Sequence, residues 1–161
     1  MTEKSVSERM RTGRAYLIKE GNPNNGFEIF TALVNNGNKG ICVSGIYPDD
    51  IKKKYDLGKA HFIWLTQNMN INKNYIHPSN ISRLGFMLKN FLRENKNAAI
   101  FLEGFEHLFA HNRYGTVMSM LYTIGDEVAV NNAKMLVLVD PFALTKKQMA
   151  FLENETEGLI L

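Results

Sequence analysis

Residues 16–28 read YLIKEGNPNNGFE, and this stretch decides which fold the sequence predicts. An apolar run of strand length is followed by Gly21, four further residues, Gly26 and a segment of helical period. Strand, glycine, four residues, glycine and helix is the order of a phosphate-binding loop. A plain turn, built from residues that tolerate left-handed backbone dihedrals, is the better explanation of the two glycines when they are taken alone.

The two residues after Gly26 depart from a working phosphate-binding loop. Such a loop continues with Lys and then Ser or Thr, because the ammonium neutralises the β and γ phosphates and the hydroxyl binds magnesium. Phe27 and Glu28 stand at these positions, and Glu28 brings a carboxylate where a phosphate needs positive charge. Backbone amides at the start of the helix can still face an anion. We therefore expect no triphosphate hydrolysis, no catalytic residue and no bound cofactor.

Apolar runs of strand length alternate with segments of helical period along the rest of the chain. This alternation implies crossover connections, and so an α/β fold with a mostly parallel sheet between two layers of helices, of the P-loop NTPase (RecA-like) type with a degenerate loop. We expect one domain over 14–161 after a flexible tail or linker over 1–13. The expected strands span 15–18, 40–44, 61–65, 98–102, 135–139 and 158–161, the expected helices 27–34, 49–55, 80–92, 114–130 and 145–152, and an expected loop 68–75.

Glycines and polar residues lie at the carboxyl ends of the expected strands, where open parallel sheets bind their ligands. Glu103 ends an apolar strand, at the place where a P-loop enzyme holds its magnesium. An acid at a helix start, favoured by the helix dipole, is the alternative interpretation of Glu103. The candidate ligand site around the degenerate loop consists of Gly21, Asn22, Asn24, Asn25, Gly26, Glu28, Ser44, Glu103 and Asp140.

With the glycine-flanked segment after the first strand and the acidic residue at the end of a later strand, residues 14–161 resemble an archaeal family known only as domain of unknown function eight-three-five. That family looks like a degenerate relative of the RecA and KaiC type ATPases. The resemblance implies a RecA-like fold, no established activity, and a place beside sensor or receiver domains in signalling proteins. The family typically has an aspartate where this chain has Glu103. The stretches that carry the resemblance are 16–20 (YLIKE), 46–48 (IYP), 64–66 (WLT), 102–108 (LEGFEHL) and 139–141 (VDP).

Composition and charge restrict the expected setting and partners. The chain has 161 residues, of which 45% are hydrophobic and 22% charged, as in an ordinary globular domain. The net charge of +3 is scattered without a basic stripe, so we expect no nucleic-acid partner. Cys42 is the only cysteine, and the sequence shows neither a signal segment nor an apolar run near the roughly 20 residues of a membrane span. A cytoplasmic protein without membrane contact is the expectation.

Three functions are compatible with these residues. The first is a non-catalytic signalling output or scaffold domain that acts through a protein partner or through self-association. The alternative is a sensor that holds a nucleotide on the amides of 21–26 without hydrolysing it. The third is a metal-dependent hydrolase that uses Glu103, His107 and His111, which are spaced four residues apart as zinc or manganese ligands on one helix face would be. No third firm ligand is evident, so we expect no metal.

Overall fold

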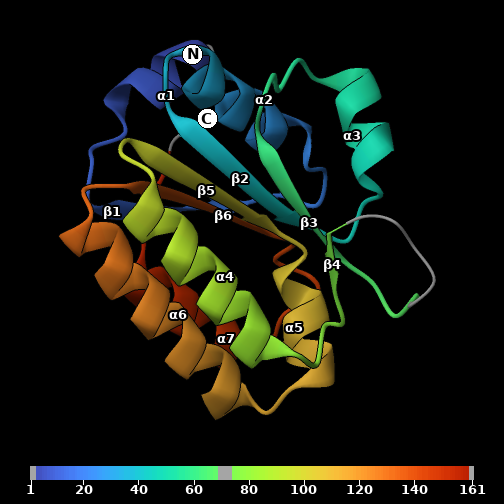
Figure 1. The fold of residues 1–161 in the computed structure, drawn as a ribbon. Coiled ribbons are helices and arrows are strands. Elements are labelled where there is room, and N and C mark those ends of the chain that lie inside the picture. Colours follow the sequence, from blue (N-terminus) through green and yellow to red (C-terminus); the bar gives the residue numbers. More distant parts are fainter. Residues whose placement is uncertain (1–2, 69–73, 160–161) are drawn as a thin grey trace.

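The structure is a computed structural model that describes residues 3–68 and 74–159. Strands and helices alternate along these residues, as the sequence predicted (Figure 1). The strands are β1 (Arg14–Lys19), β2 (Lys39–Ser44), β3 (His61–Leu65), β4 (Tyr75–Ile76), β5 (Ala98–Glu103), β6 (Lys134–Val139) and β7 (Glu157–Gly158). The helices are α1 (Glu3–Arg9), α2 (Asn24–Asn35), α3 (Pro48–Lys54), α4 (Ile81–Glu94), α5 (Phe105–His111), α6 (Tyr114–Val130) and α7 (Lys146–Glu155).

The strands form one seven-stranded sheet in the order β4-β3-β2-β5-β6-β1-β7, and every described strand pair is parallel. The register places Leu17 of β1 opposite Val137 of β6, and Ile41 of β2 opposite Ile100 of β5. Parallel strands with helices on both faces are buried throughout, which explains the uninterrupted apolar runs of the central strands. The expected α/β fold with a parallel sheet is confirmed.

Two layers of helices cover the sheet (Figure 1). Helices α1, α2 and α3 lie on one face, and α4, α5, α6 and α7 lie on the other. From β1 to β4 each new strand is added toward one edge of the sheet, and from β4 to β7 each is added toward the other edge. Because crossover connections between parallel strands share one hand, this reversal places the later helices on the opposite face from the earlier ones. A hydrophobic core lies on each face of the sheet, and alternate residues of β1 are buried in one or the other. Tyr16 and Ile18 face the α2 layer, whereas Leu17 faces the opposite layer.

The first residues differ from the expected flexible tail. Residues 3–9 form α1, and the side chains of Val6 and Met10 are buried in the core that contains α2. Val6 is only 1% exposed. Two apolar residues four positions apart lie on one side of a helix, which is sufficient to dock α1 although the rest of the segment is polar.

Helix α5 lies in a region where no helix was expected. Gly104 ends β5 with a φ of 86°, a left-handed conformation that glycine adopts without steric cost, and this residue lets the chain turn directly from strand into helix. Most of the expected loop 68–75 falls on residues 69–73, outside the described residues, and Tyr75 begins the short strand β4. The last strand, β7, begins one residue before the expected 158–161, of which 160–161 lie outside the described residues.

Candidate functional site

The carboxyl ends of the central strands bring the candidate residues to one edge of the sheet. In each of two neighbouring strand pairs, β1 with β6 and β2 with β5, one strand is followed by a helix on one face of the sheet and its neighbour by a helix on the other face. In open parallel sheets such points leave a crevice in which ligands bind. Gly21 and Asp140 follow the first pair, and Ser44 and Glu103 end the second pair. The two groups of residues are described in turn.

The segment after β1 is shorter than the expected loop 21–26. Helix α2 begins at Asn24, whose backbone amide donates to the side chain of Asn22, with 2.9 Å between the nitrogen and Oδ1. The amide of Phe27 donates to the carbonyl of Pro23 at 3.0 Å. Half of the predicted loop is therefore helix, and its amides at Asn24 and Phe27 are bonded within the chain.

Gly26 lies inside α2, and its role is packing. A Cβ placed at Gly26 would lie 2.6 Å from Cδ1 of Leu138 and 2.9 Å from Cζ of Phe101. Both contacts are far closer than ordinary van der Waals distance. The missing side chain therefore lets α2 approach β5 and β6, so this glycine serves the contact between helix and sheet.

Phe27 stands where the predicted phosphate-binding loop would have its lysine, and its side chain points into the core. It is 1% exposed. Its ring stacks on Tyr55 with 5.0 Å between centroids and meets Phe101 edge-on at 4.9 Å. Glu28, at the next position, is exposed on the outer side of α2. Neither residue is placed to contact a phosphate bound after β1.

A carboxylate also lies at the start of α2. The side-chain amide of Asn25 donates to both carboxylate oxygens of Glu20, at 3.2 and 3.0 Å. An anion bound at the first turn of the helix would meet the negative charge of Glu20, which opposes the attraction of the helix dipole. The loop thus lacks the positive charge that a phosphate requires.

Ser44 and Glu103 form a hydrogen-bonded pair at the second crevice. The hydroxyl of Ser44 donates to Oε2 of Glu103 at 2.5 Å and accepts from the backbone amide of Ile46 at 2.9 Å. Burial raises the pKa of Glu103 above its ordinary value, and the negative charge of Glu106 acts in the same direction. The hydrogen bonds from Ser44 and from the amide of Gly45, and the nearby His107, oppose this rise.

The pair is covered by residues that the sequence interpretation did not assign to it. A Cβ at Gly45 would lie 2.7 Å from Nε2 of His107, so the glycine allows the imidazole to approach the end of β2. The indole nitrogen of Trp64 donates to the carbonyl of Gly45 at 3.2 Å, and the ring of Tyr47 packs edge-on against Trp64. The glycine directly after Ser44 was the one sequence signal for this close approach.

The three proposed metal ligands do not all come together: His107 lies near Glu103, but His111 lies elsewhere. His111 lies against the ring of His77, with centroids 5.6 Å apart, and its Nε2 is 3.4 Å from the amide nitrogen of Gln67. Among the described residues, no three side chains of His, Cys, Asp or Glu are placed to hold a metal ion. The hydrolase that would use Glu103, His107 and His111 therefore gains no support from their arrangement.

Asp140 organises the turn after β6. Its carboxylate accepts from the amide of Phe142 at 2.9 Å, and its carbonyl accepts from the amide of Ala143 at 3.0 Å. A Cβ at Gly21 would lie 3.6 Å from the same carboxylate, so Asp140 and the loop after β1 are neighbours as predicted from their strand ends. The turn leaves the side chain of Phe142 97% exposed.

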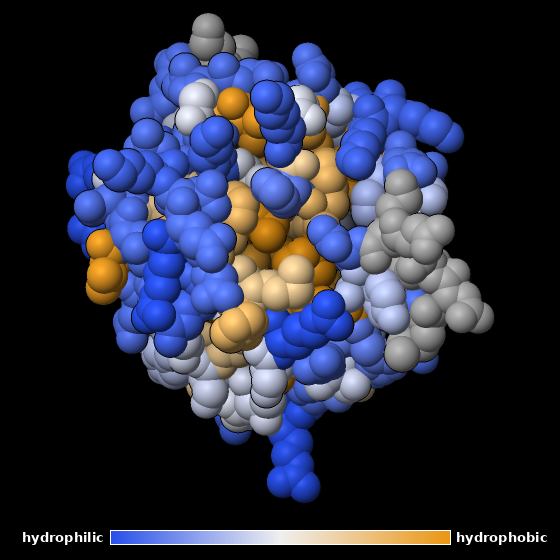
Figure 2. Space-filling model, in the orientation of Figure 1, coloured by the Kyte–Doolittle hydropathy of each residue, from blue (hydrophilic) through white to orange (hydrophobic). Residues whose placement is uncertain are grey.

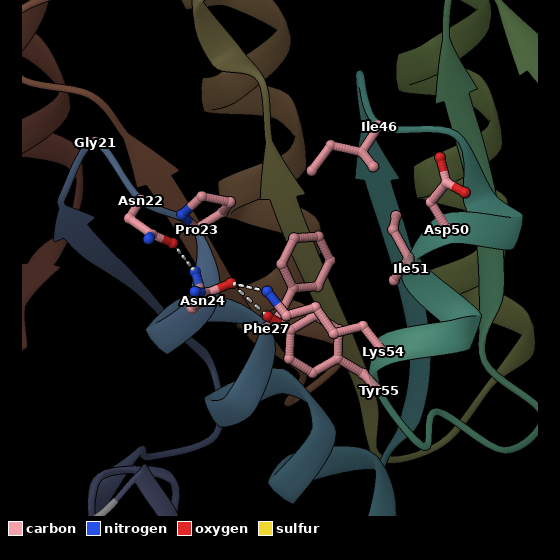
Figure 3. A pocket seen from close by; sticks show the side chains of 10 residues that line it. All are labelled: Gly21, Asn22, Pro23, Asn24, Phe27, Ile46, Asp50, Ile51, Lys54 and Tyr55. Carbon is pink, nitrogen blue, oxygen red and sulfur yellow. Dashed lines mark hydrogen bonds between the residues drawn. The ribbon is translucent and has the colours of Figure 1, made fainter.

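A cavity of about 580 Å³ lies between the start of α2 and α3 (Figure 3). The side chains of Asn22, Asn24 and Pro23 lie on its α2 side, and Asp50 lies across it on α3. Oδ1 of Asn24 accepts hydrogen bonds from Nζ of Lys54 at 2.7 Å and from the hydroxyl of Tyr55 at 2.8 Å. The full lining is Gly21, Asn22, Pro23, Asn24, Phe27, Ile46, Asp50, Ile51, Lys54 and Tyr55.

One edge of the sheet is uncovered beside β3. Strand β4 pairs with Trp64 and Leu65, and no described strand pairs with this edge over residues 61–63. Figure 2 shows apolar side chains gathered in a hollow near the middle of the face drawn. A groove of about 490 Å³ runs between β3 and α4, and its lining is mixed: the apolar residues are Ile41, Phe62, Ile63, Met87 and Phe91, and the polar ones are His61, Asn74, Asn90, Glu94 and Asn95. Such an edge presents unpaired backbone groups.

The comparison with protein families agrees with the resemblance carried by the strand ends. A family model described as Protein of unknown function (DUF835) matches residues 19–156. The chain belongs to the DUF835 family. No curated protein matches this DUF835 chain.

A solved structure from Pyrococcus horikoshii OT3, described as a structural study of Project ID PH0250, is similar to the DUF835 domain. The two chains are 13% identical and superpose with a TM-score of 0.65, over 97% of this chain and 85% of the other. At this identity the likeness shows a shared fold and nothing further. In the part of the DUF835 chain that the structure describes, no helix is both long and apolar enough to cross a membrane.

Proposed function

We propose that this domain is a non-catalytic signalling output or scaffold module of RecA- or KaiC-like ancestry, which acts through contacts with a protein partner or a second copy. The ancestry is supported by a glycine-flanked segment after β1 and an acidic residue at the end of β5, both at the carboxyl edge of one parallel sheet. The absence of catalysis is supported by Phe27, because a buried phenylalanine stands where a phosphate-binding lysine would be needed.

The state of Glu103 also supports the absence of catalysis. An acidic residue binds magnesium as an ionised carboxylate with an oxygen available to the ion. One oxygen of Glu103 accepts the hydroxyl of Ser44, and burial raises the pKa of the group. Both effects make Glu103 a poorer magnesium ligand than the acid of a working ATPase.

Phe142 is the observation that carries the proposal of protein contacts. An almost fully exposed phenylalanine gains nothing in water, whereas aromatic side chains supply much of the binding energy in protein interfaces. The two hydrogen bonds to Asp140 fix the turn, so the ring is presented on an ordered backbone and little entropy is lost on binding. Its neighbours Pro141 and Ala143 are exposed as well, which extends the apolar contact surface.

The proposal is tested by replacing Phe142 and a matched control. We expect Phe142→Asp to abolish self-association in sedimentation measurements, or, where the wild type is monomeric, to remove one specific partner from those cross-linked by a photoreactive residue placed at Ala143. Phe86, which is 64% exposed on α4, is the control, and Phe86→Asp leaves the same contact intact. Equal association of all three proteins, or magnesium-dependent ATP turnover by the wild type, overturns the proposal.

A second candidate function is a sensor that binds a nucleotide without turnover. The cavity between α2 and α3 favours it, because it combines apolar walls with a few convergent polar groups, as small-molecule sites do. Calorimetric titration with ATP and ADP, each with and without magnesium, tests this candidate. Saturable binding at micromolar affinity supports a sensor, and no heat at millimolar nucleotide rejects it.

A further inference from the structure

We propose that the cavity between α2 and α3 binds a nucleoside, either free or as part of a nucleotide, through its base and ribose. This inference rests on the second candidate function, and it moves the ligand from the backbone of 21–26 to a site built by side chains of two helices. The cavity volume of about 580 Å³ lies within the roughly 300–1,000 Å³ that small-molecule sites occupy.

The walls of the cavity suit a flat ring. The ring of Tyr55 borders the cavity and stacks on the buried ring of Phe27 with an angle of 16° between their planes, which holds the aromatic side of the cavity in place. Ile46, Ile51 and Pro23 complete the apolar lining (Figure 3). Bases bind to proteins by stacking on aromatic and apolar side chains, and this contact is tolerant of which base is bound.

Two amides supply hydrogen-bond groups for a base edge. Oδ1 of Asn22 accepts from the amide of Asn24, and Oδ1 of Asn24 accepts from Lys54 and Tyr55. These bonds occupy the carbonyl oxygen of both side chains, so the donor that each side chain has for a ligand is its Nδ2 group. Asparagine amides pair with the ring nitrogen and exocyclic groups of bases.

The charged residues of the cavity suit the rest of a nucleotide. Asp50 lies across the cavity from Asn22 and Asn24, and a carboxylate in such a place accepts hydrogen bonds from ribose hydroxyls (Figure 3). Lys54 is exposed at the same site and offers an ammonium to a single phosphate. Glu20 is outside the lining but is hydrogen-bonded to Asn25 in the first turn of α2, so a longer chain of phosphates directed toward the loop meets a negative charge.

Calorimetry with the whole chain separates recognition of the nucleoside from recognition of phosphate. The titrants are adenosine, guanosine, AMP, ATP and inorganic phosphate. We expect saturable binding of at least one nucleoside, binding of its monophosphate about tenfold more tightly through Lys54, and no binding of inorganic phosphate. Binding of ATP alone, with phosphate as an effective competitor and nucleosides inert, overturns the inference in favour of the loop amides.

Substitutions in the lining locate the site. Ile46→Trp fills the cavity from a half-buried wall and is expected to weaken nucleoside binding at least tenfold, whereas Ile46→Val leaves it within twofold. Lys54→Ala is expected to remove the advantage of the monophosphate over the nucleoside. Lys53→Ala, on the same helix but outside the lining, is the matched control and is expected to keep that advantage. Circular dichroism and thermal unfolding establish that each variant is folded.

The outcomes distinguish this inference from the functions on which it depends. Nucleoside binding that is unchanged in Ile46→Trp, together with a monophosphate advantage that persists in Lys54→Ala, overturns the cavity as the site and leaves the sensor function standing. No binding of any nucleoside or nucleotide overturns the inference together with the sensor function. The protein-contact proposal depends on Phe142, which does not line the cavity, so its test gives an independent result.

Discussion

The hydroxyl of Ser44 donates a 2.5 Å hydrogen bond to the carboxylate of Glu103, and this bond joins the ends of two strands from residues 59 positions apart in the sequence. Ser44 is 2% exposed, so the bond is shielded from water. It holds the carboxylate of Glu103 against the end of the neighbouring strand. The stability and the pH response of the domain both depend on this pair.

Replacing Ser44 tests the contribution of this bond to stability. We expect Ser44→Ala to lower the free energy of unfolding by about 1–3 kcal/mol at neutral pH, because it leaves a carboxylate oxygen of Glu103 without its partner in a mostly buried place. Urea denaturation measures the difference. The control Ser119→Ala, on the exposed side of α6, is expected to stay within about 0.5 kcal/mol, and an equal effect of both changes contradicts the role of the pair.

The raised pKa of Glu103 predicts a definite response to pH. Burial disfavours the charged carboxylate in the folded state, so the folded protein holds its proton at a pH where the unfolded chain has released it. The stabilising effect of this protonation is fully present below the ordinary pKa of glutamic acid and is lost as pH rises through the raised pKa. We expect Glu103→Gln to remove this loss, which denaturation series from pH 4 to pH 8 can measure.

Glu127 is an internal comparison for the same series. The hydrogen bond from Arg93 lowers its pKa, so its contribution to stability is present above the ordinary pKa of glutamic acid and is lost as pH falls through the lowered value. The two residues therefore affect the pH profile in opposite directions. A Glu103→Gln profile with the same slope as the wild type from pH 4 to pH 8 would show that the pKa of Glu103 is not raised.

Gly26 is expected to resist substitution although it lies in a helix. Alanine at this position gains about 1 kcal/mol of helix propensity but pushes its Cβ against Leu138 and Phe101, and overpacking of this kind costs about 1–3 kcal/mol. We expect a net loss of unfolding free energy for Gly26→Ala. Gly125→Ala in α6 has open space at its Cβ and is expected to be neutral or stabilising. Thermal unfolding of the two variants gives the comparison, and a stabilised Gly26→Ala contradicts the packing role.

Introducing the lysine and threonine of a phosphate-binding loop is not expected to produce ATP binding. The double substitution Phe27→Lys with Glu28→Thr places a lysine in the aromatic core between Tyr55 and Phe101. Burial of the ammonium and loss of the ring are expected to cost at least about 3 kcal/mol of stability. Glu28→Thr alone, at an exposed position, stays within about 0.5 kcal/mol. Calorimetric binding of ATP by a folded double variant contradicts this account.

The sequence predicted the regular elements well where hydrophobic periodicity is strong. The strand His61–Leu65 and the helix Tyr114–Val130 have the predicted bounds, and the expected helix 145–152 is present as α7, which begins with a capping box of Thr145 and Gln148. Periodicity reports which faces of an element are buried, and both elements are buried as their patterns require. The parallel sheet followed from the alternation of strands with helices.

The parts that could not be predicted depend on contacts between distant residues. Gly26 has the spacing of a loop glycine, and its packing role is visible only when Phe101 and Leu138 are brought beside it. Helix α1 carries too few apolar residues for a periodic signal, and it is held by burial of Val6 and Met10. The cavity between α2 and α3 needs side chains from two helices that no local pattern connects.

The placement of β1 affects how the chain can fold during synthesis. This strand lies in the sheet between β6 and β7, so Arg14 pairs with Lys134 and Tyr16 pairs with Glu157, both of which are synthesised much later. A chain emerging from the ribosome can pair β2 with β3 early, but β1 has no neighbouring strand until almost the whole domain has been made. Truncation near the carboxyl end therefore removes partners from the first strand as well as the last, and an incomplete chain exposes an unpaired apolar strand to aggregation.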